Sequence, residues 1–451
     1  MKKLTIIIIC LIFVICLFSG CKNQEIVDPM PEQDQPTNGL SMAMAPFKMA
    51  TSVYVTDGCG NEDGFYTIRN NNMIDHEDMS RNILYIDYAT KKQVYLCAQP
   101  NCSHNNEACT SWLAPGSGET ILALSEDKLV VLYVDVLPRI EIMDLNGANR
   151  KTLCNFGDGA AIGYVAVFNG QYLVLPVERY VMDDIGQVSS ANTLCAVDME
   201  TGEQTTVFTY VPETNDPTLA GYSRVSLMGI TDTGFIMSSV TMGVFEYNEN
   251  PEITFENMQR VTEYKIFELP YNGGEAKTLL TYFEDDPCMV SILDRYLFFI
   301  RNIGGAIKLI KMDVATGETT TLIGDFADAG MIRTAVYNTI NNWGIDPHFA
   351  GNRIFLKNIY TPEIGADRQV DYFSVDIDTG TIQEITLSYS YNATRMPMPI
   401  LAVFGDSMLI HAKVEDLPNV SGTGYFKFTP AIISADDYLA SNPNFDWIDT
   451  V

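Results

Sequence analysis

Apolar and polar residues alternate along this chain in short runs, and the runs recur as a unit. Six segments share one pattern of an alternating run, an acidic residue, a turn often written Thr-Gly or Asn-Gly, and a second run; they begin at Ile83, Ile140, Leu194, Tyr264, Leu309 and Tyr372. Glycine adopts the positive φ that such a turn needs, and an Asp side chain can accept hydrogen bonds from the turn backbone. The pattern therefore predicts six β-hairpins.

A further apolar strand precedes each hairpin. Seven such strands are predicted, starting at Gly64, Lys128, Gln171, Gly234, Arg295, Arg353 and Ser407. The hairpin after the seventh strand, from Tyr425, is degenerate, as terminal repeats often are. The repeat averages roughly 58 residues, longer than a solenoid repeat and typical of a propeller blade. We expect an all-β protein, a β-propeller of seven blades, with six or eight as alternatives.

The N-terminal residues follow another pattern. Lys2 and Lys3 precede an apolar run from Leu4 to Phe18, and Phe-Ser-Gly-Cys ends at Cys21. The run is shorter than the roughly 20 residues that span a bilayer as a helix. This arrangement resembles bacterial lipoprotein signals, which implies a lipid on the Cys21 thiol and cleavage before it. We expect residues 1–20 to be a signal peptide, with an uncleaved anchor helix as the alternative.

Residues 21–45 are rich in Pro, Gln, Asp, Glu and Asn and have almost nothing to bury, so we expect a disordered tether that starts at the lipidated cysteine. No second linker of this kind follows. We therefore expect residues 46–451 to form one propeller domain. Together with the signal, this places the protein at the cell membrane, lipid-anchored on the extracytoplasmic face.

Charge narrows the range of partners. The formal net charge is −29, and nucleic acid and anionic headgroups both require basic patches. We expect no nucleic-acid partner, and we expect membrane attachment to depend on the lipid. Hydrophobic residues make up 47% of the chain, enough for a large core.

One cluster of residues has the chemistry of a metal site. Cys97, Cys102, His104 and Cys109 could surround a zinc ion, and a site with four protein ligands is structural. The spacing is not that of a common zinc finger. Two of the cysteines could instead form a disulfide, an iron–sulfur site could use the same ligands, or the thiols could be inert.

A ligand of a propeller is expected to bind among the connections between strands and blades. Long connections are predicted at 97–120, 179–192, 241–262, 325–348 and 387–400. Two of them carry aromatic and polar residues suited to a sugar or peptide: Tyr337 and Trp343 beside Asn341 and Asn342, and Tyr389 and Tyr391 beside Asn392 and Arg395. Ordinary packing between blades is the competing interpretation.

The sequence contains no G-x-S-x-G, H-E-x-x-H, P-loop or G-x-G-x-x-G motif, and it has four histidines. We therefore expect a non-catalytic binding or scaffold module for an envelope protein, peptide or glycan rather than an enzyme. The alternative is a carbohydrate-active or other hydrolytic enzyme with a site built from channel-facing loop carboxylates. Convergence of two or three such carboxylates would distinguish the enzyme from the binding module.

Three motifs carry a resemblance to a known group of proteins: the box ending at Cys21, the segment Val94–Cys109, and the segment Ile432–Ile448. With them the chain resembles the lipid-anchored TolB-like β-propeller lipoproteins of anaerobic Gram-positive bacteria. The resemblance implies a propeller and a membrane address. That group has no agreed activity, so no catalytic residue follows from it.

Overall fold

A computed structural model describes most of the chain after residue 46. It covers residues 47–51, 58–70, 80–182, 188–210, 224–244, 261–332, 340–363, 366–391, 394–417 and 425–451. All of these belong to the compact unit Thr37–Val451. The predicted signal peptide, Cys21 and the tether lie outside the described residues. None of the helices in the described part is both long and apolar enough to cross a membrane.

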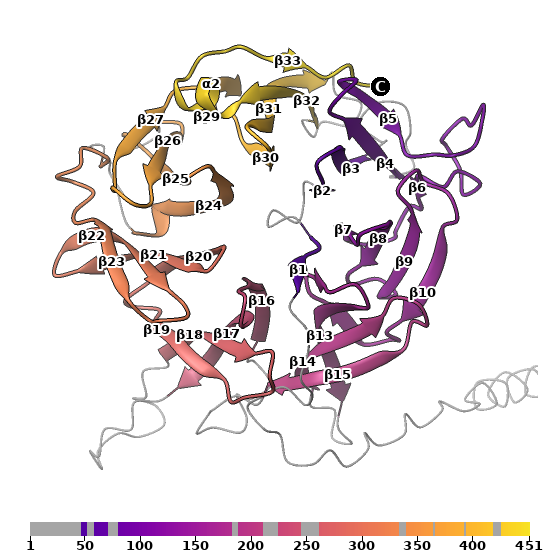
Figure 1. Cartoon of the computed structure of the whole chain (residues 1–451), viewed down its shortest axis with the longest axis horizontal. Helices are drawn as coiled ribbons and strands as arrows, with labels where there is room; N and C mark the ends of the chain where they lie inside the picture. Colours follow the sequence, from indigo (N-terminus) through magenta and orange to yellow (C-terminus); the bar gives the residue numbers. More distant parts are fainter. Residues whose placement is uncertain are drawn as a thin grey trace, which may run out of the picture. The chain divides into compact units, whose positions relative to one another are not determined.

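Seven antiparallel sheets of four main strands form a ring of blades, with the first strand of each blade innermost (Figure 1). This confirms the predicted seven-bladed β-propeller. Blade 1 contains β2 (Cys59–Gly60), β3 (Gly64–Asn70), β4 (Arg81–Asp87) and β5 (Lys92–Tyr95), and β6 (Trp112–Leu113) also pairs with β4. Blade 2 contains β7 (Thr120–Leu124), β8 (Lys128–Tyr133), β9 (Arg139–Asp144) and β10 (Lys151–Asn155).

The next three blades repeat this order. Blade 3 contains β12 (Val167–Phe168), β13 (Tyr172–Met182), β14 (Val188–Asp198) and β15 (Gln204–Tyr210), with β11 (Ala160–Ile162) paired to β13. Blade 4 contains β16 (Arg224–Ile230), β17 (Gly234–Val244), β18 (Val261–Pro270) and β19 (Lys277–Phe283). Blade 5 contains β20 (Cys288–Leu293), β21 (Tyr296–Ile303), β22 (Ala306–Asp313) and β23 (Thr319–Ile323).

The last two blades have additions. Blade 6 contains the short 3-10 helix η3 (Ile340–Asn342), then β24 (Trp343–Ala350), β25 (Arg353–Tyr360), β26 (Gln369–Asp376) and β27 (Ile382–Ile385). A separate hairpin, β28 (Ser388–Tyr391) and β29 (Thr394–Pro397), follows it. Blade 7 contains β30 (Ile400–Phe404), β31 (Ser407–Leu417), β32 (Tyr425–Ser434) and β33 (Asp446–Trp447), with α2 (Ala435–Leu439) between the last two strands.

The core lies between the blades, so central strands are buried on both faces. Leu129 to Tyr133 of β8 are each at most 1% exposed. One cluster joins blades 2 and 3, and another joins blades 5 and 6. Because each sheet packs against a neighbour on both sides, these strands are continuous apolar runs rather than strict alternations.

The recurring Asp turns have the predicted role. The carboxylates of Asp87, Asp198, Asp313 and Asp376 each accept a hydrogen bond from the backbone N–H three residues later, at 2.7 to 3.1 Å. The turn glycine has a second role. A methyl group on Gly202 would lie 2.3 Å from the carbonyl oxygen of Leu153, in the preceding blade. This glycine therefore permits close contact between blades as well as a positive φ.

Two terminal segments pair in ways that the sequence pattern did not indicate. The first described strand, β1 (Lys48–Met49), pairs with β12 of blade 3 rather than joining blade 1. At the other end, β33 completes blade 7, and Asp449 bridges to Lys92 of blade 1. The rings of Tyr88 and Phe404 stack across the same junction, with centroids 3.7 Å apart.

Candidate functional site

Strand direction places the long connections on one side of the propeller. Strands alternate in direction within every blade, so second-to-third-strand connections and blade-to-blade connections leave the same face. All five connections singled out above are of these two kinds. We call this side the long-connection face. The Asp turns lie on the opposite face.

Two carboxylate residues meet on the long-connection face at the inner end of blade 2. Glu119 immediately precedes the innermost strand β7, and Asp135 follows β8. Asp135 Oδ1 accepts the backbone N–H of Glu119 at 3.0 Å, and Tyr164 donates its hydroxyl to Glu119 Oε2 at 2.6 Å. Tyr164 lies between β11 and β12 of blade 3, so the group spans two blades.

An arginine supports this group. Nη2 of Arg81 donates to Ser117 Oγ at 2.7 Å, to Gly118 O at 2.7 Å and to Thr120 Oγ1 at 2.8 Å, and so holds the segment that carries Glu119. Burial lowers the pKa of Arg81, whereas the neighbouring acidic groups oppose that shift.

The tyrosine in the group stays protonated. The hydrogen bond to Glu119 raises the pKa of Tyr164 to about 12, so this phenol donates at neutral pH. The group thus combines two exposed carboxylates with a fixed hydrogen-bond donor. Carboxylates are among the side chains that general acid–base chemistry uses.

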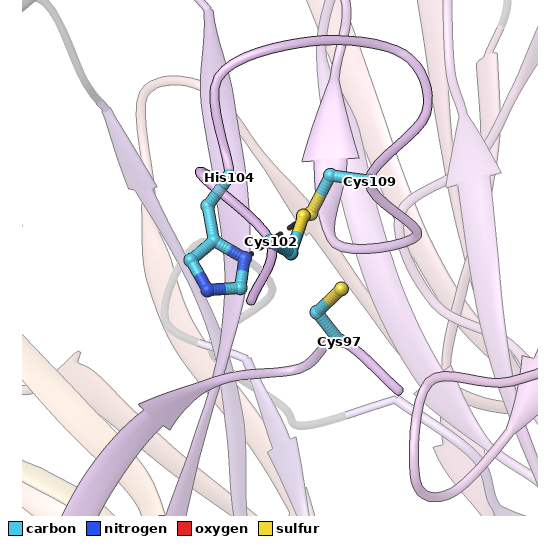
Figure 2. A group of neighbouring side chains, drawn as sticks. All are labelled: Cys97, Cys102, His104 and Cys109. Atoms are coloured by element: carbon cyan, nitrogen blue, oxygen red, sulfur yellow. Dashed lines mark hydrogen bonds between the residues drawn. The ribbon is translucent and has the colours of Figure 1, made fainter. Parts of the chain in front are cut away.

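The predicted metal ligands converge on one point. The donor atoms of Cys97, Cys102, His104 and Cys109 all lie within 4.8 Å of one another (Figure 2). Tetrahedral ligands about 2.3 Å from a zinc ion lie roughly 3.8 Å apart. His104 faces the thiols with Nδ1, which is 3.3 Å from Cys109 Sγ. The cluster can therefore bind a metal ion.

Local backbone geometry produces this convergence. The segment leaves the outer strand β5 and turns back through Asn101 and His104, whose φ values are +58° and +57°. The N–H of Cys109 donates to Asn106 O at 3.0 Å, and the N–H of Trp112 donates to Cys109 O at 3.1 Å. These turns bring residues separated in sequence around one centre.

The pKa shifts of Cys97 and His104 favour metal binding, whereas that of Cys109 opposes it. Burial raises the pKa of Cys109 to about 11. Burial also acts on Cys97, but hydrogen bonds, led by the Gln99 N–H, hold its pKa below the usual value. Burial lowers the pKa of His104 and so favours the neutral imidazole that metals bind. All seven described cysteines are free thiols.

The metal loop is attached to both neighbouring sheets. Nη1 of Arg150 in blade 2 donates to the carbonyl oxygens of Thr110 and Trp112, each at 2.8 Å. Ser111 Oγ lies 3.1 Å from Cys109 Sγ and accepts Nδ2 of Asn82 at 2.9 Å. The loop therefore bridges blades 1 and 2.

The aromatic candidates do not form one site in the described residues. Trp343 is 2% exposed and packs in the blade 5–6 core, with its ring 4.4 Å from that of Phe326. Tyr337 lies outside the described residues. Tyr389 and Tyr391 belong to β28, and Tyr389 packs against the blade 6–7 core.

Arg395, the charged member of that set, lies on the adjoining strand β29. Its Nε donates to Ser388 Oγ at 2.8 Å, and its Nη2 donates to Thr386 O at 2.7 Å. These bonds hold the hairpin to the end of blade 6.

His348 has a partner that the sequence did not reveal. Its Nδ1 lies 2.8 Å from Asp346 Oδ1, and its Nε2 lies 3.2 Å from Leu401 O. The hydroxyl of Tyr372 also donates to Asp346, at 2.6 Å. This network joins blade 6 to blade 7 and belongs to their packing.

Comparison with known proteins gives structural matches alone. No family model matches the sequence, and no curated protein does. A prolyl endopeptidase structure matches with 9% identity and a TM-score of 0.52, covering 91% of this chain and 50% of that one. Oligogalacturonate lyase from Vibrio parahaemolyticus matches with 11% identity and a TM-score of 0.46, covering 82% and 89%.

A TolB protein from Agrobacterium tumefaciens also matches, with 13% identity and a TM-score of 0.28, covering 66% of this chain and 84% of that one. The matches thus include a TolB-like propeller. This chain spans about half the length of the peptidases it matches, between 50% and 56%. At these identities the likeness shows the fold.

The comparisons contradict our prediction of a non-catalytic binding or scaffold module. The matched structures include several peptidases, among them the prolyl endopeptidase, and a lyase. The prediction rested on the absence of familiar catalytic motifs, and that absence does not exclude an enzyme, because a site assembled from separate loops leaves no compact sequence signature. The hydrolytic alternative agrees better with these findings.

Proposed function

We propose that this protein is a hydrolytic enzyme that acts on a peptide or glycan outside the cell membrane. The observation that supports the proposal is the meeting of Glu119 and Asp135 with Tyr164 on the long-connection face. The prolyl endopeptidase named above has the same fold, which is consistent with a hydrolytic role.

The proposed chemistry uses both carboxylates. One carboxylate takes a proton from water, or attacks the substrate itself, while the other, in its acid form, protonates the leaving group. The scissile C–O or C–N bond breaks, and water supplies OH to one product and H to the other. Tyr164 holds Glu119 in place, because its hydroxyl donates to one carboxylate oxygen and leaves the second free for the reaction.

The test is turnover on a panel of peptides and oligosaccharides by the full-length chain. Glu119→Gln and Asp135→Asn should each lower kcat by roughly 100-fold or more while the melting temperature stays close to that of the wild type. Glu203→Gln is the matched control, because Glu203 is an exposed carboxylate in an Asp turn on the opposite face. Full activity in both site variants, or no turnover of any panel member, would overturn the proposal.

We further propose that Cys97, Cys102, His104 and Cys109 hold a structural zinc ion. Three thiolates and an imidazole are a ligand set that zinc prefers, and four protein ligands leave no position for substrate. Their donor atoms already lie close together, which supports this assignment.

Elemental analysis with free-thiol counting tests the zinc proposal. One zinc per chain is expected in the wild type and in Ser103→Ala, whereas Cys102→Ser should lose it. Thiols of the cluster should become reactive only after chelation. A disulfide within the cluster in metal-free protein purified from its native host would contradict the assignment.

The proposal also includes the location of the protein: a lipid on Cys21 anchors the chain on the extracytoplasmic face of the membrane. The export signal and the cysteine that ends it support this address. Labelling cells with a radioactive or clickable fatty acid should mark the wild type and Cys16→Ser, and should not mark Cys21→Ser. Label retained in Cys21→Ser would exclude lipidation at this residue.

A further inference from the structure

We propose that blade 6 contains a binding site for a small ligand that carries a carboxylate. A cavity of about 310 Å³ opens at the long-connection end of this blade. Its lining residues are Asn341, Asn342, Ile359, Tyr360, Thr361 and Arg368. The set is mostly polar and contains one cation. No part of the proposed cleavage site belongs to it, so the two proposals stand independently.

Three segments form the cavity. The 3-10 helix η3 ends in Asn341 and Asn342, just before the innermost strand β24. Strand β25 ends at Tyr360, and Arg368 immediately precedes β26. The cavity is therefore built on the ends of three neighbouring strands of one sheet, a rigid support for the polar groups around it.

Arg368 is the group that selects the charge of the ligand. It is exposed, and within the described residues it makes no hydrogen bond or ion pair with another side chain. A guanidinium binds a carboxylate through two parallel hydrogen bonds, which gives both strength and orientation.

Two buried residues of the strands that support the cavity have polar atoms without a hydrogen-bond partner. Asn358 is fully buried, and neither its Nδ2 nor its Oδ1 has a hydrogen-bond partner. Trp343, its cross-strand neighbour, is also buried, and its Nε1 has no partner. Side chains alternate along a strand, so Asn358 shares its face of β25 with Tyr360, which lines the cavity.

Buried polar atoms without partners indicate a missing water or ligand group. Asn358 does not line the cavity, so a water held beneath the ligand supplies its partner. The carboxylate then lies at Arg368, and the Asn341 amide, which also lines the cavity, binds a group beside it. The ligand is thus a carboxylate with hydrogen-bonding groups next to it.

The volume limits the size of the ligand. About 310 Å³ is at the lower end of the range for small-molecule pockets. It suits one sugar acid or the terminal residue of a peptide, which share the required chemistry. A longer polymer would place only its end in the cavity.

Isothermal titration calorimetry with the full-length chain in detergent micelles tests the proposal and separates the two sources of carboxylate. One pair of probes is glucuronic acid and glucose, and the other is N-acetyl-alanyl-alanine and its C-terminal amide. The acid of at least one pair should bind about tenfold or more tightly than its neutral partner. Equal binding within both pairs, or no binding of either acid at millimolar concentration, would overturn the proposal.

Two variants locate the site. Arg368→Gln should weaken binding of the acid about tenfold or more, whereas Lys151→Gln, an exposed cation in blade 2, should leave it unchanged. Asn358→Leu should weaken binding while keeping or raising the melting temperature, because it removes unsatisfied polar atoms. Unchanged binding in Arg368→Gln would contradict the site.

Discussion

The imidazole of His104 stacks on the phenol ring of Tyr95, with ring centroids 4.2 Å apart and planes 11° from parallel. The Tyr95 hydroxyl accepts a hydrogen bond from Arg69, which also donates to the carbonyl oxygen of Val451 at 2.7 Å. A proposed metal ligand and the junction between blades 1 and 7 therefore share one aromatic ring. Metal binding should stabilise both the loop and this junction.

Removal of the metal should loosen two separate regions. A chelator should increase hydrogen exchange in residues 97–113, because the metal holds that loop, and also in residues 446–451, because His104 supports Tyr95 and Arg69. Strands β17 and β21, in blades 4 and 5, serve as internal controls and should not change. Added zinc should restore protection. Increased exchange in the loop alone would show that the stacked rings do not connect the two regions.

The turn glycines differ in how closely the preceding blade approaches them. Gly202 and Gly317 have nearly equal φ, 76° and 74°, but a methyl group on Gly317 would meet no atom within 4 Å. Alanine at a positive φ should cost about 1 kcal/mol at either position. Gly202→Ala should lose roughly 1 to 3 kcal/mol more, because Leu153 must shift. Chemical denaturation measures both losses, and equal losses would contradict the proposed close contact between blades.

Arg150 should control the stability of the metal loop. Arg150→Met keeps the aliphatic stem but removes the hydrogen bonds to the loop and leaves Glu141 with Arg139 as its remaining charged partner. The free energy of unfolding should fall by roughly 2 to 3 kcal/mol. Limited proteolysis should then cut within residues 97–113. The adjacent exposed Lys151→Met should resist cutting like the wild type, and a resistant Arg150→Met would refute this role.

The half-buried His411 should make stability depend on pH. Burial disfavours its imidazolium and lowers its pKa to about 4, whereas an unfolded histidine titrates near about 6.5. The unfolded state therefore binds a proton that the folded state excludes, and stability is lost as the pH falls from roughly 6.5 towards 4. Between pH 7.5 and 4.5, the wild type should lose about 2 kcal/mol more than His411→Leu.

Urea denaturation at both pH values checks this difference. Carboxylates that titrate in the same interval are common to both proteins, so their contribution cancels. Equal losses in wild type and variant would mean that His411 charges freely in the folded state.

The repeat pattern in the sequence was sufficient to predict the fold. Each Asp-turn hairpin and each preceding apolar strand appeared in the chain as a local signal, and the structure has them as the second, third and fourth strands of its blades. Local signals failed where pairing is long-range. Strand β1 joins blade 3, more than 100 residues away, and β33 closes blade 7 only after α2. No local preference specifies such partners.

The candidate sites also differ in whether the sequence alone could predict them. The ligands of the metal cluster lie close in sequence, so their spacing alone predicted their convergence. Glu119 and Asp135 flank one hairpin of blade 2, and the packing of blade 3 against that blade brings Tyr164 to Glu119. Trp343 shows the converse, since an aromatic residue beside two amides looked exposed in sequence, and packing between blades buried it.

By itself the sequence determined the all-β class, the blade repeat, the Asp turns and the cluster of candidate metal ligands. Each of these depends on residues near one another along the chain. The tertiary structure decided which acidic residues lie next to each other, which aromatics are buried and which residues line a cavity with Arg368. These features depend on how separate blades pack, and the hydrophobic packing that orders the blades fixes them without leaving a motif.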